Sequence, residues 1–135
     1  MLTKSAEIGR LVLVRMNSGE DVLESLQAAA AESGLRNGVI LSGAGSLKSY
    51  RVHVVETTNL PPGNILFDGE GAYDILTLTG AIIDGRVHAH ATFSNAEKAM
   101  GGHVHEGCAI LTFGIAVIAE TPDADLTDWD RMGQL

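Results

Sequence analysis

Four of the five histidines in this chain lie within residues 86–107, in the stretch RVHAHATFSNAEKAMGGHVHEG. They form two His-x-His pairs, His88 with His90 and His103 with His105. Imidazole nitrogens can coordinate a metal ion, transfer protons in catalysis, or serve as polar groups on the solvent face of a sheet. The spacing of the pairs, and the elements that carry them, must decide among these roles.

Strand geometry places each pair on one face. Side chains alternate across an extended strand, so His88 and His90 share a face while the apolar residues between and beside them take the other. His103 and His105 also share a face if their segment is extended. Two ligands at i and i+2 on one strand, joined by a ligand from a neighbouring strand, make a workable zinc geometry. Gly101-Gly102 permits a close backbone approach or a positive φ before His103. From the spacing alone, a metal site and a solvent-facing polar patch both remain open.

The other reactive side chains have structural interpretations. His53 stands apart on a predicted strand next to Arg51 and is interpreted as a structural histidine. Glu106 could act as a general base or an extra ligand, but its place beside Gly107 favours a solvated turn residue. Cys108 is the only cysteine, so the chain can form no internal disulfide, and its apolar surroundings predict a buried side chain in a reduced compartment.

Several familiar site motifs are excluded. A cupin would need a glutamate three or four residues after His90, where residues 93–95 are Phe, Ser and Asn. Ser42 and Ser46 do not lie in a Gly-x-Ser-x-Gly elbow, which argues against a hydrolytic triad. The Gly43–Ser46 bend leads into a predicted strand rather than a helix, and the Walker lysine is missing, so a phosphate-binding loop is not expected.

Composition narrows the class of protein. The chain has 135 residues, of which 45% are hydrophobic and 19% charged, values typical of one globular domain. Its net charge is −8, and its nine Lys and Arg residues are scattered, which disfavours nonspecific binding to nucleic acid. The N-terminus lacks the features of a signal peptide, and the longest apolar stretch, residues 110–119, is too short to span a bilayer. A soluble cytoplasmic protein is expected.

Periodicity predicts an α+β fold with about seven strands in a largely antiparallel sheet and one main helix packed on it. The helix is predicted over residues 20–33, with Ser18 and Asp21 approximating a capping box and Gly34 ending it. Asp84-Gly85 is a strong signal for a two-residue hairpin. Strands are predicted at 9–16, 37–44, 47–56, 72–83 and 86–93, with two more within 102–120 that are separated near 106–107. Loops are predicted at 57–71, with a possible short strand at 65–67, and at 94–100. Residues 1–120 are expected to form one domain and 121–135 a polar tail.

Three motifs in order resemble a known family. ILSGAGSLKSY, GAYDILTLTGAI, and HAH followed by GGHVHEG are similar to the PPC (plants and prokaryotes conserved) domain in its stand-alone prokaryotic form. The resemblance covers about residues 9–120. It implies a seven-stranded antiparallel sheet with one main helix, and a homotrimer. It also implies a label of DNA-binding protein, which the family takes from plant members that carry AT-hook segments. This chain has no such basic hook.

The resemblance also implies a metal site, because in some prokaryotic members similar to this chain three histidines resemble one, and these map onto His88, His90 and His103. Together with the strand pattern, the resemblance leads us to expect one divalent metal ion, with zinc as the first candidate. Three nitrogen donors leave a position open for water, a small anionic ligand or His105. No catalytic residue and no organic cofactor are predicted. A DNA-associated regulator and a metal-dependent enzyme remain as alternative functions.

Overall fold

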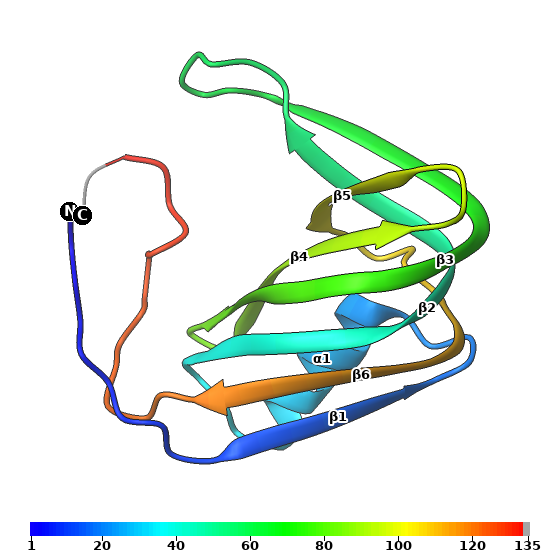
Figure 1. The fold of residues 1–135 in the computed structure, drawn as a ribbon. Helices are drawn as coiled ribbons and strands as arrows, with labels where there is room; N and C mark the ends of the chain where they lie inside the picture. Colours follow the sequence, from blue (N-terminus) through cyan, green and yellow to red (C-terminus); the bar gives the residue numbers. More distant parts are fainter. Residues whose placement is uncertain (134–135) are drawn as a thin grey trace.

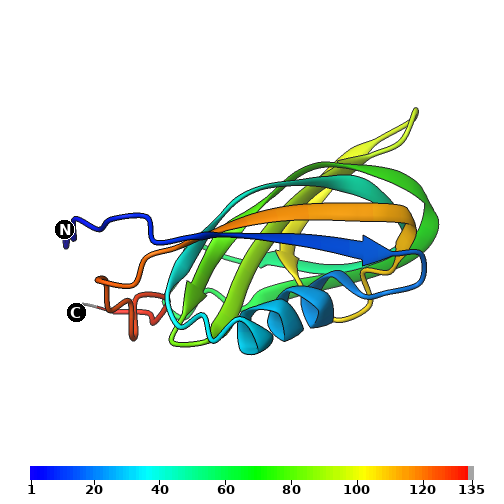
Figure 2. The ribbon, with the colours of Figure 1, turned by 90° about the horizontal axis from the view of Figure 1, so that it is seen from below.

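Six antiparallel strands form one sheet in the computed structural model, which describes residues 1–133 (Figure 1). The single helix, α1 (Val22–Glu32), runs beneath the sheet when the molecule is turned (Figure 2). These elements confirm the α+β class. In spatial order the strands are β1 (Leu11–Asn17), β6 (Ile110–Glu120), β2 (Gly38–Val55), β3 (Asn64–Ile83), β4 (Arg86–Ser94) and β5 (Ala99–Val104).

The expected count of seven strands is wrong, because residues 37–44 and 47–56 belong to one long strand, β2. The glycine-rich segment between them bends β2 without ending it. Register shifts between Ile40 and Ser42 and between Gly45 and Leu47 mark this bend. Gly45 has φ 146°, and a Cβ there would lie 2.3 Å from the carbonyl oxygen of Phe113. Glycine therefore allows β2 to curve closely over β6.

Two predicted loops are also partly strand. β3 begins at Asn64, inside the loop expected over 57–71, and runs for 20 residues. β5 begins at Ala99, inside the loop expected over 94–100. In both cases pairing with the preceding strand, β2 for β3 and β4 for β5, fixes an extended backbone whose local composition is typical of a loop. The Asp84-Gly85 hairpin is confirmed, with φ values of 48° and 79° at the two residues.

The N-cap of α1 is Asp21, not Ser18 as the sequence indicated. The carboxylate of Asp21 accepts a hydrogen bond from the backbone N–H of Glu24 at 3.1 Å. At the other end, Gly34 has φ 63° and the helix stops where it was predicted to stop. α1 has 11 residues, and within residues 1–133 no helix has the length and apolar character needed to cross a membrane.

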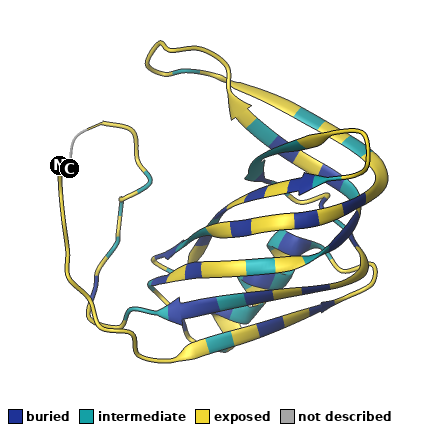
Figure 3. Cartoon of the chain, viewed as in Figure 1, coloured by how far each residue is buried: buried dark blue, intermediate teal, exposed yellow. Residues whose placement is uncertain are grey.

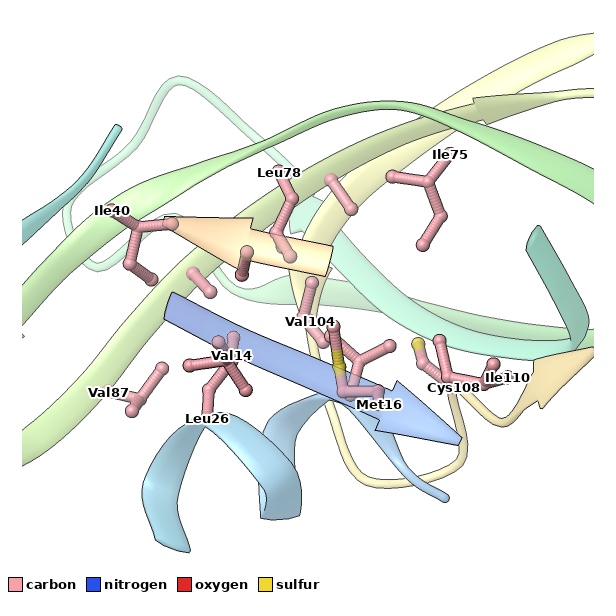
Figure 4. Packing of buried hydrophobic residues seen from close by; sticks show 14 of the residues in the cluster. Val14, Met16, Leu26, Ile40, Ile75, Leu78, Val87, Val104, Cys108 and Ile110 are labelled. Carbon is pink, nitrogen blue, oxygen red and sulfur yellow. The ribbon is translucent and has the colours of Figure 1, made fainter. Parts of the chain in front are cut away.

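The core lies between the sheet and α1. Buried and exposed residues alternate along the strands, as expected for a sheet with one covered face (Figure 3). Leu26 on the helix packs near Val14 and Met16 of β1 (Figure 4). Cys108 is a free thiol with 2% exposure, which confirms it as a core residue, and burial raises its pKa.

The bend in β2 decides where the histidines lie. The first half of β2 pairs with β6, while its second half pairs with β5 through Val52↔Val104 and His53↔His103. β5 also pairs with β4, so β2, β3, β4 and β5 form a closed circuit of paired strands. The histidine of β2 thereby becomes a neighbour of the histidines carried by β4 and β5, which lie far from it in the sequence.

Candidate metal site

A row of histidines crosses three neighbouring strands. His103 on β5 is the direct partner of His90 on β4 and of His53 on β2. His88 lies two residues from His90 on the same side of β4, and His105 follows directly after the end of β5, two residues from His103. All five histidines of the chain therefore gather in one patch.

His88, His90 and His103 come together as the sequence predicted. One ring nitrogen from each lies within 4.8 Å of the other two. The Nε2 atoms of His88 and His90 are 3.3 Å apart. Two ligands at zinc–nitrogen distances of about 2.0–2.1 Å and a tetrahedral angle would be separated by about 3.3 Å. The separation in this structure thus fits two ligands of one ion, with His103 beside both rings.

The glycines before His103 have the role expected of them as sites of close approach. A Cβ on Gly102 would lie 2.5 Å from the carbonyl oxygen of His53, and one on Gly101 would lie 2.3 Å from that of Ala91. Neither glycine has a positive φ, so backbone proximity is the relevant property. The two glycines allow β5 to fit between β2 and β4, which carries His103 to the other ligands.

His53 does not stand apart from the other histidines, contrary to the interpretation of its sequence position. Its Nδ1 lies 2.6 Å from Nε2 of His105, a hydrogen-bond distance. Its ring also stacks on that of His103, with centroids 4.6 Å apart. Nothing in the local sequence indicates this, since the contact depends on the bend in β2. Because Nε2 of His105 is engaged by His53, this arrangement does not offer His105 as a fourth donor through that nitrogen.

The electrostatic environment favours neutral imidazoles. Burial, followed by repulsion from His88, lowers the pKa of His103 from 6.5 to about 4. Burial is also the first cause that lowers the pKa of His90 and of His53. These rings are therefore neutral at pH 7 and keep a lone pair for a metal or for a hydrogen-bond donor.

A cavity of about 690 Å³ adjoins the three candidate ligands. His53 and Asp130 add polar groups to its wall, and residues from the end of β2, the β2–β3 connection and the C-terminal segment make much of the remainder apolar. Those apolar residues are Val54, Val55, Pro61, Pro62 and Met132. Glu106 is an exposed turn residue, as the sequence favoured, and lies at a neighbouring pocket that His88 and His103 also line.

Solved structures share this fold over most of the chain. A metal-containing protein from Archaeoglobus fulgidus has a TM-score of 0.78 at 20% identity, covering 92% of this chain and 89% of its own. A plant- and prokaryote-conserved (PPC) protein from Pyrococcus horikoshii has a TM-score of 0.76 at 26% identity, covering 93% and 87%. A candidate DNA-binding protein from Bacteroides thetaiotaomicron has a TM-score of 0.72 at 21% identity, covering 88% and 83%.

Sequence similarity extends to part of a much longer protein. The chain is 31% identical over 111 residues to the bifunctional protein GlmU of Synechococcus sp. strain JA-2-3B'a(2-13), and 28% identical over 113 residues to that of strain JA-3-3Ab. It spans only 17% of the length of each of these curated relatives. The match therefore concerns one segment of GlmU.

The family assignment rests on nearly the whole domain. The sequence profile of the Plants and Prokaryotes Conserved (PCC) domain matches residues 3–122, which include every strand, α1 and all five histidines. The described fold agrees with that of the PPC protein from Pyrococcus horikoshii. This chain belongs to the PCC domain family.

Proposed function

We propose that the protein binds one divalent metal ion through His88, His90 and His103. The observation that carries this proposal is the convergence of three imidazole nitrogens within 4.8 Å. The metal-containing relative from Archaeoglobus fulgidus, which has the same fold, supports it. Zinc is the first candidate, since it accepts three neutral imidazoles and leaves a fourth position open.

The open position, in our proposal, holds a small anionic ligand. A divalent ion bound by three neutral imidazoles keeps its positive charge, so it attracts an anionic donor atom. The adjoining cavity of about 690 Å³ has room for the rest of such a ligand. Its apolar wall around Val54, Pro61 and Met132 suits a hydrocarbon portion. The function is thus metal-dependent binding of a small molecule.

Elemental analysis of untagged protein tests this function. After zinc loading and dialysis at pH 7.5, we expect about one equivalent of zinc per chain, because the three ligands serve a single ion. Loading with manganese or magnesium should leave much less metal, since imidazole prefers zinc over these ions. Less than about a tenth of an equivalent of zinc would overturn the proposal.

We also propose a homotrimer, with the outer face of the sheet as the contact between copies. This face, opposite α1, presents large apolar side chains to solvent, among them Leu13 with 73% exposure and Phe113 with 44%. An apolar surface spread over four adjacent strands is typical of an interface. A second copy is the occupant that the family resemblance favours. The apolar residues are Leu11, Leu13, Val39, Leu41, Leu76, Leu111, Phe113 and Ile115.

Light scattering is expected to give a mass near three times 14.2 kDa. Leu13→Asp should lower that mass by placing a charge in the contact, whereas Leu60→Asp should not, because Leu60 lies in the β2–β3 connection and is 87% exposed there. A monomer at all concentrations would contradict the trimer, and dissociation by Leu60→Asp alone would contradict the chosen face.

Direct DNA binding has less support from the charges. The chain has nine Lys and Arg residues against 17 Asp and Glu. Four of the cations, Arg10, Arg36, Arg86 and Arg131, are paired with carboxylates. Neutralising phosphates requires clustered free cations, so association with DNA would need a cationic partner.

We also propose a cytoplasmic location for the protein. The buried free thiol of Cys108 is consistent with the reducing environment of the cytoplasm.

A further inference from the structure

The segment that follows β6 reaches back to the candidate metal site. Its course over the domain is fixed by Ala124, which is buried, and by Leu126, whose backbone N–H donates to Oδ1 of Asn37 at 3.2 Å. Figure 2 shows this red segment beside the β3–β4 end of the sheet. It lies beyond residue 122, where the family match ends. Its contacts with the domain therefore come from residues outside the matched range.

Asp130 is the residue through which this segment contacts the histidines. Its carboxylate accepts two hydrogen bonds from the guanidinium of Arg86, at 2.8 and 3.1 Å. Its Oδ2 also lies 3.3 Å from Nδ1 of His88. Only 9% of the Asp130 side chain is exposed. Arg86 and His88 are two residues apart on β4, so they share the face that receives the carboxylate.

This contact decides which nitrogen of His88 is available. A carboxylate accepts a hydrogen bond from Nδ1 only when that nitrogen carries the proton. In a neutral ring the lone pair is then on Nε2, and Nε2 of His88 is the atom that lies 3.3 Å from Nε2 of His90. Carboxylates that orient a ligating histidine in this way are a common outer shell of metal sites.

We propose that Asp130, held by Arg86, is a positioning residue that fixes the tautomer and ring orientation of His88 for metal binding. This inference rests on the proposed metal-binding function and deepens it. It assigns part of the site to the C-terminal segment, outside the matched domain. The proton on Nδ1 and the carboxylate would together direct the lone pair on Nε2 toward the ion.

Competition with a chromophoric chelator measures the effect on zinc affinity. Asp130→Ala is expected to weaken zinc binding about 10- to 100-fold, as is common when an outer-shell partner is lost. Asp123→Ala is the matched control, since it removes an exposed carboxylate of the same segment. We expect it to change the affinity by less than about twofold. Equal affinities in wild type and Asp130→Ala would overturn the inference and leave the proposed function standing.

A second readout needs no metal. Long-range ¹H–¹⁵N spectra of the metal-free protein at pH 7.5 report which nitrogen of His88 is protonated. The wild type should show the proton on Nδ1, and Asp130→Ala should show a larger population with the proton on Nε2. The same tautomer in both proteins would overturn the inference, even if zinc binding differs. If the wild type binds no zinc, the proposed function fails, and these spectra still decide whether Asp130 positions His88.

Discussion

His90→Ala will lower the affinity of the protein for zinc by more than about 100-fold. Loss of an outer-shell partner costs up to about 100-fold, and loss of a direct ligand should cost more. His90 supplies the Nε2 atom that lies 3.3 Å from its counterpart in His88, and it is the direct cross-strand partner of His103. Its removal leaves two nitrogens, fewer than the three protein ligands of open zinc sites. Chelator competition at pH 7.5 measures the affinity.

His105→Ala is the matched control for this loss. It also removes an imidazole from the same patch, but the Nε2 atom of His105 is directed to His53 rather than to the three ligands. We expect its zinc affinity to stay within about threefold of wild type, a change of about 0.7 kcal/mol. A large loss in His105→Ala, or wild-type affinity in His90→Ala, would show that another set of nitrogens holds the ion.

The three central histidines could be predicted because their signals are local. Strand alternation alone places His88 and His90 on one face, and Gly101-Gly102 indicates a close approach before His103. His53 could not be predicted in the same way. It meets His103 and His105 only because β2 bends and pairs with β5, and that long-range pairing leaves no trace in the residues around His53.

Asp130 escaped prediction for a related reason. The segment around Asp130 is polar, and no sequence pattern links it to β4. Asp130 lies 42 residues after His88, the β4 residue that it contacts. The strand count failed by the same kind of long-range effect. The Gly43–Ser46 sequence is typical of a turn, yet these residues lie inside the single strand β2. Gly45 allows β2 to approach the backbone of Phe113 on β6 closely. The local sequence predicts that the strands and the helix exist. Where one strand ends and the next begins depends on which other strand supplies its hydrogen bonds.

Gly102→Ala will both destabilise the protein and weaken zinc binding. The new Cβ would lie 2.5 Å from the carbonyl oxygen of His53, a backbone atom that cannot move without shifting β2. Overpacking of this kind costs about 1–3 kcal/mol in the free energy of unfolding. Separation of β5 from β2 also displaces His103, the next residue, so we expect zinc affinity to fall by about 100-fold, or about 2.7 kcal/mol. Urea denaturation and chelator competition measure the two effects.

Ile118→Ala separates the two effects of this substitution. Ile118 is fully buried on β6, a strand that does not pair with β4 or β5, so its truncation should cost about 2–5 kcal/mol of stability. The folded fraction of this variant should nevertheless bind zinc as tightly as wild type, because no ligand moves. If both variants lost affinity in proportion to stability, zinc binding would depend on the whole core. Retained affinity in Ile118→Ala and its loss in Gly102→Ala would instead identify the β2–β5 junction as the feature that holds His103 in place.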